Sequence, residues 1–256
     1  MGKEKNLIEE LYAQEFDEHG VQMLLLGAPG LGKTTFAISG APTPLVLDME
    51  GGAKRYKRLN SSMRRVDASA LNWTQLMALL DVAATSDHAT IVLDTADAAA
   101  ELLRQHLVEV FSLNIEKDSL VNAGRGYGHA FDVMASHWRI MIQKLNILTA
   151  KGKHVVVVCH VDDKEVTKPN QRPYTAQVIR LPKKIAPYLS EWAEIIGHLE
   201  LESSDTGESV ESSKSRLLHI SPDIHVLAKN RFNLPEPTLV NSTFGNLLQL
   251  IEEYNP

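Results

Sequence analysis

The stretch Gly27-Ala-Pro-Gly-Leu-Gly-Lys-Thr-Thr35 follows a short apolar run and precedes residues that are compatible with a helix. Four of its residues, Gly27, Gly32, Lys33 and Thr34, satisfy the pattern G-x-x-x-x-G-K-[ST]. Glycines allow backbone N–H groups to curl around phosphate oxygens, and the N-terminus of the following helix adds a favourable dipole. An ordinary glycine-rich turn has no need for Lys followed by Thr. The stretch therefore predicts a phosphate-binding loop between a strand and a helix.

Each side chain of this loop has an expected task. Lys33 is expected to reach the outer phosphates, and the Thr34 hydroxyl is expected to ligate Mg²⁺. No N-K-x-D motif that would read guanine occurs, so the expected cofactors are ATP and Mg²⁺. The expected nucleotide contacts are Gly27, Pro29, Gly30, Leu31, Gly32, Lys33, Thr34 and Thr35.

A second metal anchor is expected at the end of the apolar run Thr90-Ile-Val-Leu-Asp94. The carboxylate of Asp94 fits the Walker B position, although an Asp can also cap the helix that begins near Asp97. Thr95 follows Asp94, which disfavours ATPases that place their catalytic Glu directly after the Walker B Asp.

The expected catalytic carboxylate follows another apolar strand, Leu45-Val-Leu-Asp48. In an open parallel sheet the chemistry gathers at the carboxyl ends of the strands, and Glu50 lies just past this end. A carboxylate beside the γ-phosphate can orient and polarise the attacking water. Glu50 is the predicted base, and Asp48, nearer the strand interior, is the competing candidate.

Apolar periodicity predicts an α/β fold with a mostly parallel central sheet and helices on both faces. The predicted buried strands are 21–26, 44–48, 90–94 and 154–160, and the predicted helices include 4–18, one marked by Leu103, Leu107 and Val110, and one marked by Phe131, Met134, Trp138, Met141, Leu145 and Leu148.

The pattern changes after residue 185. A helical piece around Leu189, Trp192 and Ile195 precedes expected strands near 196–202, 215–220 and 223–228, which we expect to extend the sheet in antiparallel fashion. Residues 203–215 are polar turn formers and predict an exposed hairpin tip, and 243–254 predict a closing helix. The expected organisation is an N-terminal helix, residues 1–20, as a candidate oligomer contact, and one ATPase domain, residues 21–256.

Composition excludes several classes of protein. The single cysteine, Cys159, excludes an internal disulfide framework, and the histidines show no metal-ligand spacing, so no zinc site is expected. No apolar stretch approaches the roughly 20 residues that cross a bilayer, and the N-terminus lacks the order of a secretory signal. We therefore expect a cytoplasmic protein without a membrane partner. The formal net charge of −6 does not exclude a local basic groove.

Taken together, the order of these motifs resembles the RecA-like P-loop ATPases, in which the catalytic Glu follows the strand between the two Walker elements. His160 falls where that family places a polar γ-phosphate sensor, and Lys229 and Arg231 resemble the K-x-R element that reaches into a neighbouring subunit's ATP site. The segment Gly124-Arg-Gly-Tyr-Gly128 resembles the small phage-encoded RecA-core ATPases of single-strand annealing and recombination. The resemblance spans roughly residues 20 to 235.

This resemblance implies ATP hydrolysis in a homo-oligomeric ring or filament that acts on single-stranded DNA, inside a bacterial host if the protein is phage-encoded. A single-strand-binding protein is a further candidate partner. Two rivals remain open: a helicase loader or other motor ATPase, and a nucleotide-gated DNA-binding module that hydrolyses slowly.

Two loops of the RecA family line a DNA channel, and this sequence has corresponding segments, one from Ser112 to His129 and one from Val161 to about Arg180. The candidate DNA-binding residues are Arg125, Tyr127, Lys164, Lys168, Arg172, Tyr174, Lys183 and Lys184. From Lys164 to Lys184 the cations outnumber Glu165, the only acid, and the two tyrosines could stack on bases. The run Lys54-Arg-Tyr-Lys-Arg58, with Arg64 and Arg65, is equally basic and is the alternative surface.

Overall fold

The computed structural model describes residues 19–113, 120–121, 123, 128–167, 172–205 and 210–255. The predicted N-terminal helix, residues 1–20, lies almost entirely outside the described residues, as do the candidate DNA-binding residues Arg125, Tyr127 and Lys168.

A central sheet organises the chain, and six of its strands run parallel to one another in the order β8-β1-β5-β4-β2-β3. Their central members are buried on both faces, as the continuous apolar runs predict. The parallel strands are β1 (Gln22–Leu26), β2 (Pro44–Asp48), β3 (Arg64–Asp67), β4 (Thr90–Asp94), β5 (His154–Cys159) and β8 (Ile195–Asp205).

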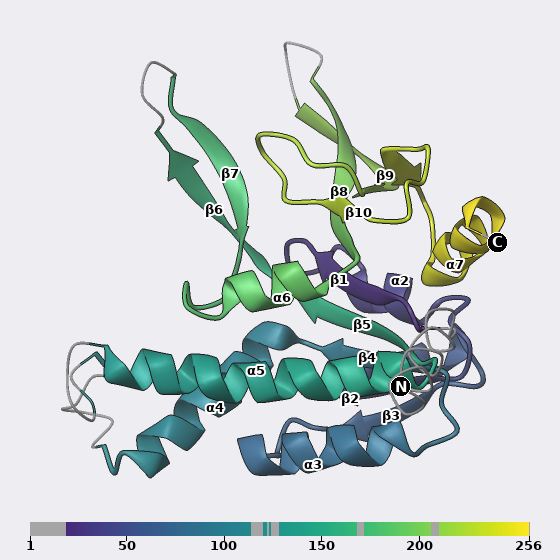
Figure 1. Ribbon diagram of the computed structural model, residues 1–256. Coiled ribbons are helices and arrows are strands. Elements are labelled where there is room, and N and C mark those ends of the chain that lie inside the picture. The colour runs from purple at the N-terminus through teal and green to yellow at the C-terminus, as the bar shows by residue number, and fades with distance from the viewer. Residues whose placement is uncertain are drawn as a thin grey trace, which may run out of the picture.

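Helices cover both faces of this sheet (Figure 1). Alternate residues of each strand point to opposite faces. Leu24 packs on the face covered by helices α3, α4, α5 and α6, and Met23 and Leu25 pack on the face covered by helices α2 and α7. The helices are α2 (Lys33–Ile38), α3 (Trp73–Ala84), α4 (Ala96–Val110), α5 (His129–Ala150), α6 (Ala186–Trp192) and α7 (Phe244–Tyr254), with a short 3₁₀ helix, η1 (Gly52–Arg58). The predicted α/β class with a mostly parallel sheet is confirmed.

Antiparallel strands from the C-terminal part of the chain extend the sheet beside β8. β9 (Val210–His219) pairs with β8, β11 (Thr238–Val240) pairs with β9, and the two-residue β10 (Lys229–Asn230) pairs with the start of β8. A separate hairpin, β6 (Val161–Val166) and β7 (Tyr174–Ile179), follows β5. Figure 1 shows the β6–β7 hairpin and the β8–β9 hairpin projecting from the same side of the molecule.

Several predictions about the elements were wrong in detail. Ile195 begins β8 instead of continuing α6, whereas Leu103, Leu107 and Val110 all lie in α4 as predicted. β8 pairs with β1 in parallel, so the antiparallel extension begins only at β9. Residues 223–228 form no strand, because the backbone N–H groups of His225 and Val226 donate hydrogen bonds to Asp223 Oδ1 and fold this segment into a turn.

Two segments in which no strand is predicted, one expected as a loop and one as a hairpin tip, are largely strands. The expected basic loop from Val161 to about Arg180 is the β6–β7 hairpin, and much of the polar segment 203–215 lies in the ends of β8 and β9. Backbone pairing to a neighbouring strand, which polar side chains do not prevent, explains both differences. Within the part of the chain that the structure describes, none of the helices has the length and apolar character that a bilayer crossing requires.

The ends of the central strands position the candidate site. Asp48 is in register with Asp94, and Asp94 with Val158, so β2, β4 and β5 end at nearly the same level. The phosphate-loop candidate follows β1 on this edge. Residues that follow these strands are therefore brought together, as expected for the carboxyl edge of a parallel sheet.

Candidate nucleotide-binding site

The loop between β1 and α2 adopts a conformation that only glycine accommodates at two positions. Gly27 has φ +153°, and a Cβ added to it would lie 2.6 Å from the carbonyl oxygen of Leu199. Gly32 has φ +91° and immediately precedes α2. These glycines hold the loop close to β8 and turn its backbone towards the start of the helix, as the sequence motif predicts.

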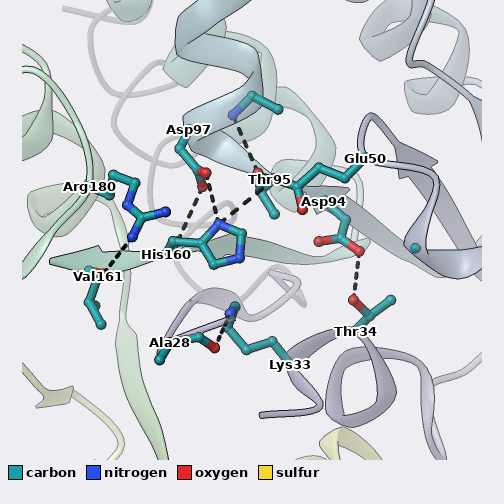
Figure 2. Close-up of polar contacts among 12 residues, drawn as sticks. Ala28, Lys33, Thr34, Glu50, Asp94, Thr95, Asp97, His160, Val161 and Arg180 are labelled. Atoms are coloured by element: carbon teal, nitrogen blue, oxygen red, sulfur yellow. Dashed lines mark hydrogen bonds and ion pairs between the residues drawn. The ribbon is translucent and has the colours of Figure 1, made fainter. Parts of the chain in front are cut away.

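The side chain of Lys33 folds back over its own loop. Its Nζ donates to the carbonyl oxygens of Gly27 (2.9 Å) and Ala28 (2.8 Å), and the residue is buried (Figure 2). Burial lowers the pKa of Lys33, and the charge of nearby Asp94 works in the opposite direction. The ammonium therefore lies inside the loop, where a phosphate group could replace the two carbonyl contacts.

Thr34 and Asp94 meet although they are far apart in the sequence. The Thr34 hydroxyl donates to Asp94 Oδ2 at 2.7 Å (Figure 2). Burial raises the pKa of Asp94 to about 6, against the opposing effect of this hydrogen bond. A hydroxyl and a carboxylate are oxygen donors of the kind that Mg²⁺ prefers, so the donor set fits the predicted metal.

Asp48 and Glu50 differ in what holds them. The Asp48 carboxylate is fully buried and accepts hydrogen bonds from the backbone N–H groups of Gly52 (3.1 Å) and Ala53 (3.0 Å) and from Arg65 Nε (2.5 Å). Its oxygens are thus committed to the start of η1. Glu50 is exposed, and its Oε1 accepts a hydrogen bond from the Thr95 hydroxyl at 3.0 Å.

His160 lies on the same edge and is bound by Asp97, for which the sequence predicts only a place near the start of a helix. Asp97 accepts hydrogen bonds from the His160 backbone N–H (3.2 Å) and from its Nδ1 (2.8 Å) (Figure 2). Burial opposes ionisation of Asp97, but the hydrogen bonds from His160 and its charge outweigh it and lower the Asp97 pKa to about 2.

The turn from β4 into α4 connects these groups. Thr95 caps α4 by accepting from the Ala98 N–H, and the same hydroxyl donates to Glu50. His160 Nδ1 lies 3.9 Å from Glu50 Oε1, and polar atoms of Glu50, Asp97 and His160 all lie within 4.8 Å of one another. The structure therefore brings Glu50 and His160 together beside the loop that carries Lys33, and it adds Thr95 and Asp97 to the candidate site.

Lys229 and Arg231 lie at the opposite edge of the sheet. The ammonium of Lys229 donates to the carbonyl oxygens of Ser190, Glu191 and Ala193 and so caps the C-terminal end of α6. Arg231 lines a cavity of about 450 Å³ together with Gln22, the first residue of β1. Neither residue reaches the nucleotide site of its own chain, and the Lys229 ammonium is engaged by backbone carbonyls at the end of α6.

The candidate DNA-binding cations on the β6–β7 side are partly paired within the chain. Lys184 forms an ion pair with Asp132 (2.7 Å), and the neighbouring Arg180 pairs with Asp162 (2.6 Å). β6 also carries three acids, Asp162, Asp163 and Glu165, and a single lysine, Lys164. The β6–β7 hairpin as a whole is therefore less basic than the stretch from Lys164 to Lys184. Arg172 and Lys183 are exposed, and the Tyr174 ring contacts the ring of His225.

Comparisons with known proteins identify one family. A model of the AAA domain matches residues 19–232, which is most of the chain. No curated protein matches the sequence significantly. Similar solved structures are the RadB recombinase (16% identity, 91% of each chain covered, TM-score 0.48), a KaiC-like protein from Pyrococcus horikoshii (15% identity, 78% of each chain covered, TM-score 0.45) and the flagellar accessory protein FlaH from Methanocaldococcus jannaschii (11% identity, 88% of this chain and 86% of that chain covered, TM-score 0.43).

Proposed function

The chain belongs to the AAA domain family and has a RecA-like P-loop ATPase core, and from this premise we propose that it hydrolyses ATP with Mg²⁺ at the carboxyl edge of its sheet. In this proposal the backbone N–H groups of residues 27–35 surround the phosphates, and Lys33 exchanges its two carbonyl contacts for the outer phosphate oxygens. Thr34 and Asp94 hold Mg²⁺, which when bound supplies charge neutralisation for these phosphates.

Water activation is assigned to Glu50. Its carboxylate is exposed at the site, and the Thr95 hydroxyl fixes one of its oxygens, which leaves the other free to accept a proton from the attacking water. His160, fixed through Nδ1 by Asp97, is placed to contact the γ-phosphate with its other ring nitrogen.

One observation carries this proposal: Glu50, held by Thr95, lies within 3.9 Å of His160 on the edge where Thr34 and Asp94 meet. Asp48, the competing carboxylate, is fully buried and accepts three hydrogen bonds from its own chain.

A pair of variants tests the assignment. Glu50→Gln should bind ATP and Mg²⁺ as the wild type does but lose turnover by about 100-fold or more, because the amide cannot accept the proton. Asp48→Asn should lower stability, since it weakens the contacts to η1 and Arg65, and should retain most turnover in the folded protein. Turnover is measured by phosphate release and binding by calorimetry. If Asp48→Asn abolishes turnover and Glu50→Gln does not, the wrong carboxylate has been chosen.

The proposal extends to an assembly that acts on single-stranded DNA. Arg231 lies far from the site of its own chain, which is the arrangement expected of a group that completes a neighbouring subunit's site in a ring or filament. The motif order resembles that of the phage-encoded ATPases of recombination and single-strand annealing, and we assign the protein to this process. Turnover that rises on addition of single-stranded DNA would separate it from a loader that responds to a protein partner.

A further inference from the structure

The 3₁₀ helix η1 carries a basic run that the proposed chemistry does not use. Ala53 is buried, and Tyr56 packs partly against the hydrophobic core. In a 3₁₀ helix residues three apart lie above one another, so these two residues form the inner edge. Lys54, Arg55, Lys57 and Arg58 consequently occupy the outer edges, and all four are exposed. We name these four residues the η1 patch.

The η1 patch is held firmly at both ends. At its start the buried Asp48 accepts hydrogen bonds from the backbone of Gly52 and Ala53. Just past its end, Asn60 Nδ2 donates to the carbonyl oxygens of Ile38 (2.9 Å) and Ala41 (2.8 Å) at the end of α2. The four cations therefore project from an ordered platform.

Within the part of the chain that the structure describes, no acidic side chain pairs with the cations of the η1 patch. No acidic residue occurs from residue 51 to residue 64. Among the described residues none of the four cations forms an ion pair, whereas the nearby Arg65 pairs with both Asp48 and Asp67. Lys54 lies above Lys57 and Arg55 above Arg58, about 6 Å apart along the axis, so each pair repels. An external polyanion would relieve this repulsion.

We propose that the η1 patch binds the phosphate backbone of single-stranded nucleic acid, an inference that rests on the proposed DNA partner and locates its contact. Closely spaced Lys and Arg side chains suit a phosphate backbone, and binding that depends on backbone charge needs no particular bases. The core of a protein interface is instead depleted of lysine and enriched in apolar area, and the patch offers four cations beside one exposed apolar side chain, Leu59.

The η1 patch lies next in sequence to the segment that carries Glu50, so nucleic acid bound there can affect ATP turnover. η1 begins two residues after Glu50, and the carboxylate of Asp48 connects the end of β2 to the first turn of η1. Nucleic acid bound to the patch would therefore rest against the segment that presents Glu50 to the nucleotide. We expect bound nucleic acid to stimulate turnover through this segment.

A charge-matched pair of variants tests the inference in the full-length protein. One variant changes Lys54, Arg55, Lys57 and Arg58 to Gln, and the control changes Lys164, Arg172, Lys183 and Lys184 to Gln, so both lose the same charge. Affinity for a single-stranded oligodeoxythymidylate is measured across a salt series, without nucleotide and with ATP. Thermal unfolding and light scattering check the fold and the assembly of each protein.

The η1 variant should lose about three units of the slope of log affinity against log salt, since each lost single-strand contact contributes roughly 0.7. Between 50 and 200 mM salt this amounts to about 50-fold less change in affinity. The control should keep the steeper slope. Basal ATP turnover of the η1 variant should match the wild type, while the increase caused by DNA disappears.

Three outcomes overturn the inference, and they differ in what they leave standing. A wild-type slope in the η1 variant removes the patch from the DNA contact but leaves the proposed partner intact. Dissociation of the assembly with unchanged DNA affinity would mean that the patch meets an acidic surface of a second copy. Absence of single-strand binding by the wild type itself would refute the DNA partner, and with it the inference, but not ATP hydrolysis.

Discussion

Asp48 and Glu50 stand two positions apart after one strand, and their surroundings give them different chemistry. The buried carboxylate of Asp48 receives two backbone N–H groups and a guanidinium, so its charge is used to hold η1 and Arg65. Among the described residues, the Glu50 carboxylate accepts a hydrogen bond from Thr95 alone, and it remains exposed. A carboxylate with a free oxygen can accept a proton from water, and one whose oxygens are all engaged by the fold is a poor base.

His198 on β8 is a buried polar residue whose two ring nitrogens have no hydrogen-bond partner among the described residues. Burial lowers its pKa to about 4 from the usual 6.5. The folded protein therefore holds His198 neutral, while the unfolded chain takes up a proton below pH 6.5. Stability from this residue is complete above pH 6.5 and is lost as the pH falls towards 4.

His198→Leu should remove this part of the pH dependence. The wild type should lose up to roughly 3 kcal/mol of unfolding free energy between pH 6.5 and pH 4 through His198, and the variant should not. At pH 7 the variant should be at least as stable, because it removes unsatisfied polar atoms. Urea unfolding at several pH values measures both. His137 and His154, whose pKa values are also lowered, remain in both proteins, so parallel stability curves would contradict the prediction.

At the scale of elements, the turn from β4 into α4 performs three tasks within four residues. Asp94 binds the Thr34 hydroxyl, Thr95 binds Glu50, and Asp97 binds His160. A single short segment thus sets the relative positions of the candidate metal ligand, base and sensor. A shift of this turn would disturb all three together.

Asp97→Asn tests the third of these tasks. The amide keeps the size of the side chain but loses the charge that holds His160, so kcat should fall by about tenfold while the affinity for ATP changes little. Steady-state kinetics and ATP binding separate the two effects. Asp81→Asn is the matched control, because Asp81 pairs with Lys144 on helices outside the site. Equal kcat values for the two variants would argue that His160 needs no support from Asp97.

The sequence predicted the buried strands because each is a continuous apolar run that ends at a polar residue, as Thr90–Asp94 does. It could not predict β6, in which four charged residues follow one another and only pairing with β7 defines the strand. It also missed the partnership of Asp97 with His160, since 63 positions separate them and the fold alone brings them together. The order of motifs indicated which strand ends carry polar groups, but not which groups share a hydrogen bond.

At the scale of the whole molecule, the two edges of the sheet carry different groups. Lys33, Asp94, Glu50 and His160 gather at the carboxyl edge. Arg231 directly follows Asn230 of β10, and Asn230 is paired with Ile195 of β8. Ile195 is in turn paired with Met23 of β1, which lies four residues before Gly27. About 13 Å of strand therefore separates its backbone from the start of the phosphate loop. The role proposed for Arg231 is therefore at the nucleotide site of another copy of the chain.

Mixing two inactive variants tests this claim. Arg231→Ala keeps Glu50 but supplies no guanidinium, and Glu50→Gln supplies the guanidinium but lacks the base, so each homogeneous assembly should be nearly inactive. With equal random mixing, about a quarter of the interfaces pair an intact Glu50 with an intact Arg231, and turnover should recover towards that fraction of the wild-type value. Arg139→Ala, in the same cavity, is the control and should retain turnover if the cavity itself is not required. If co-assembly is demonstrated and the mixture stays as inactive as its components, Arg231 does not act between subunits.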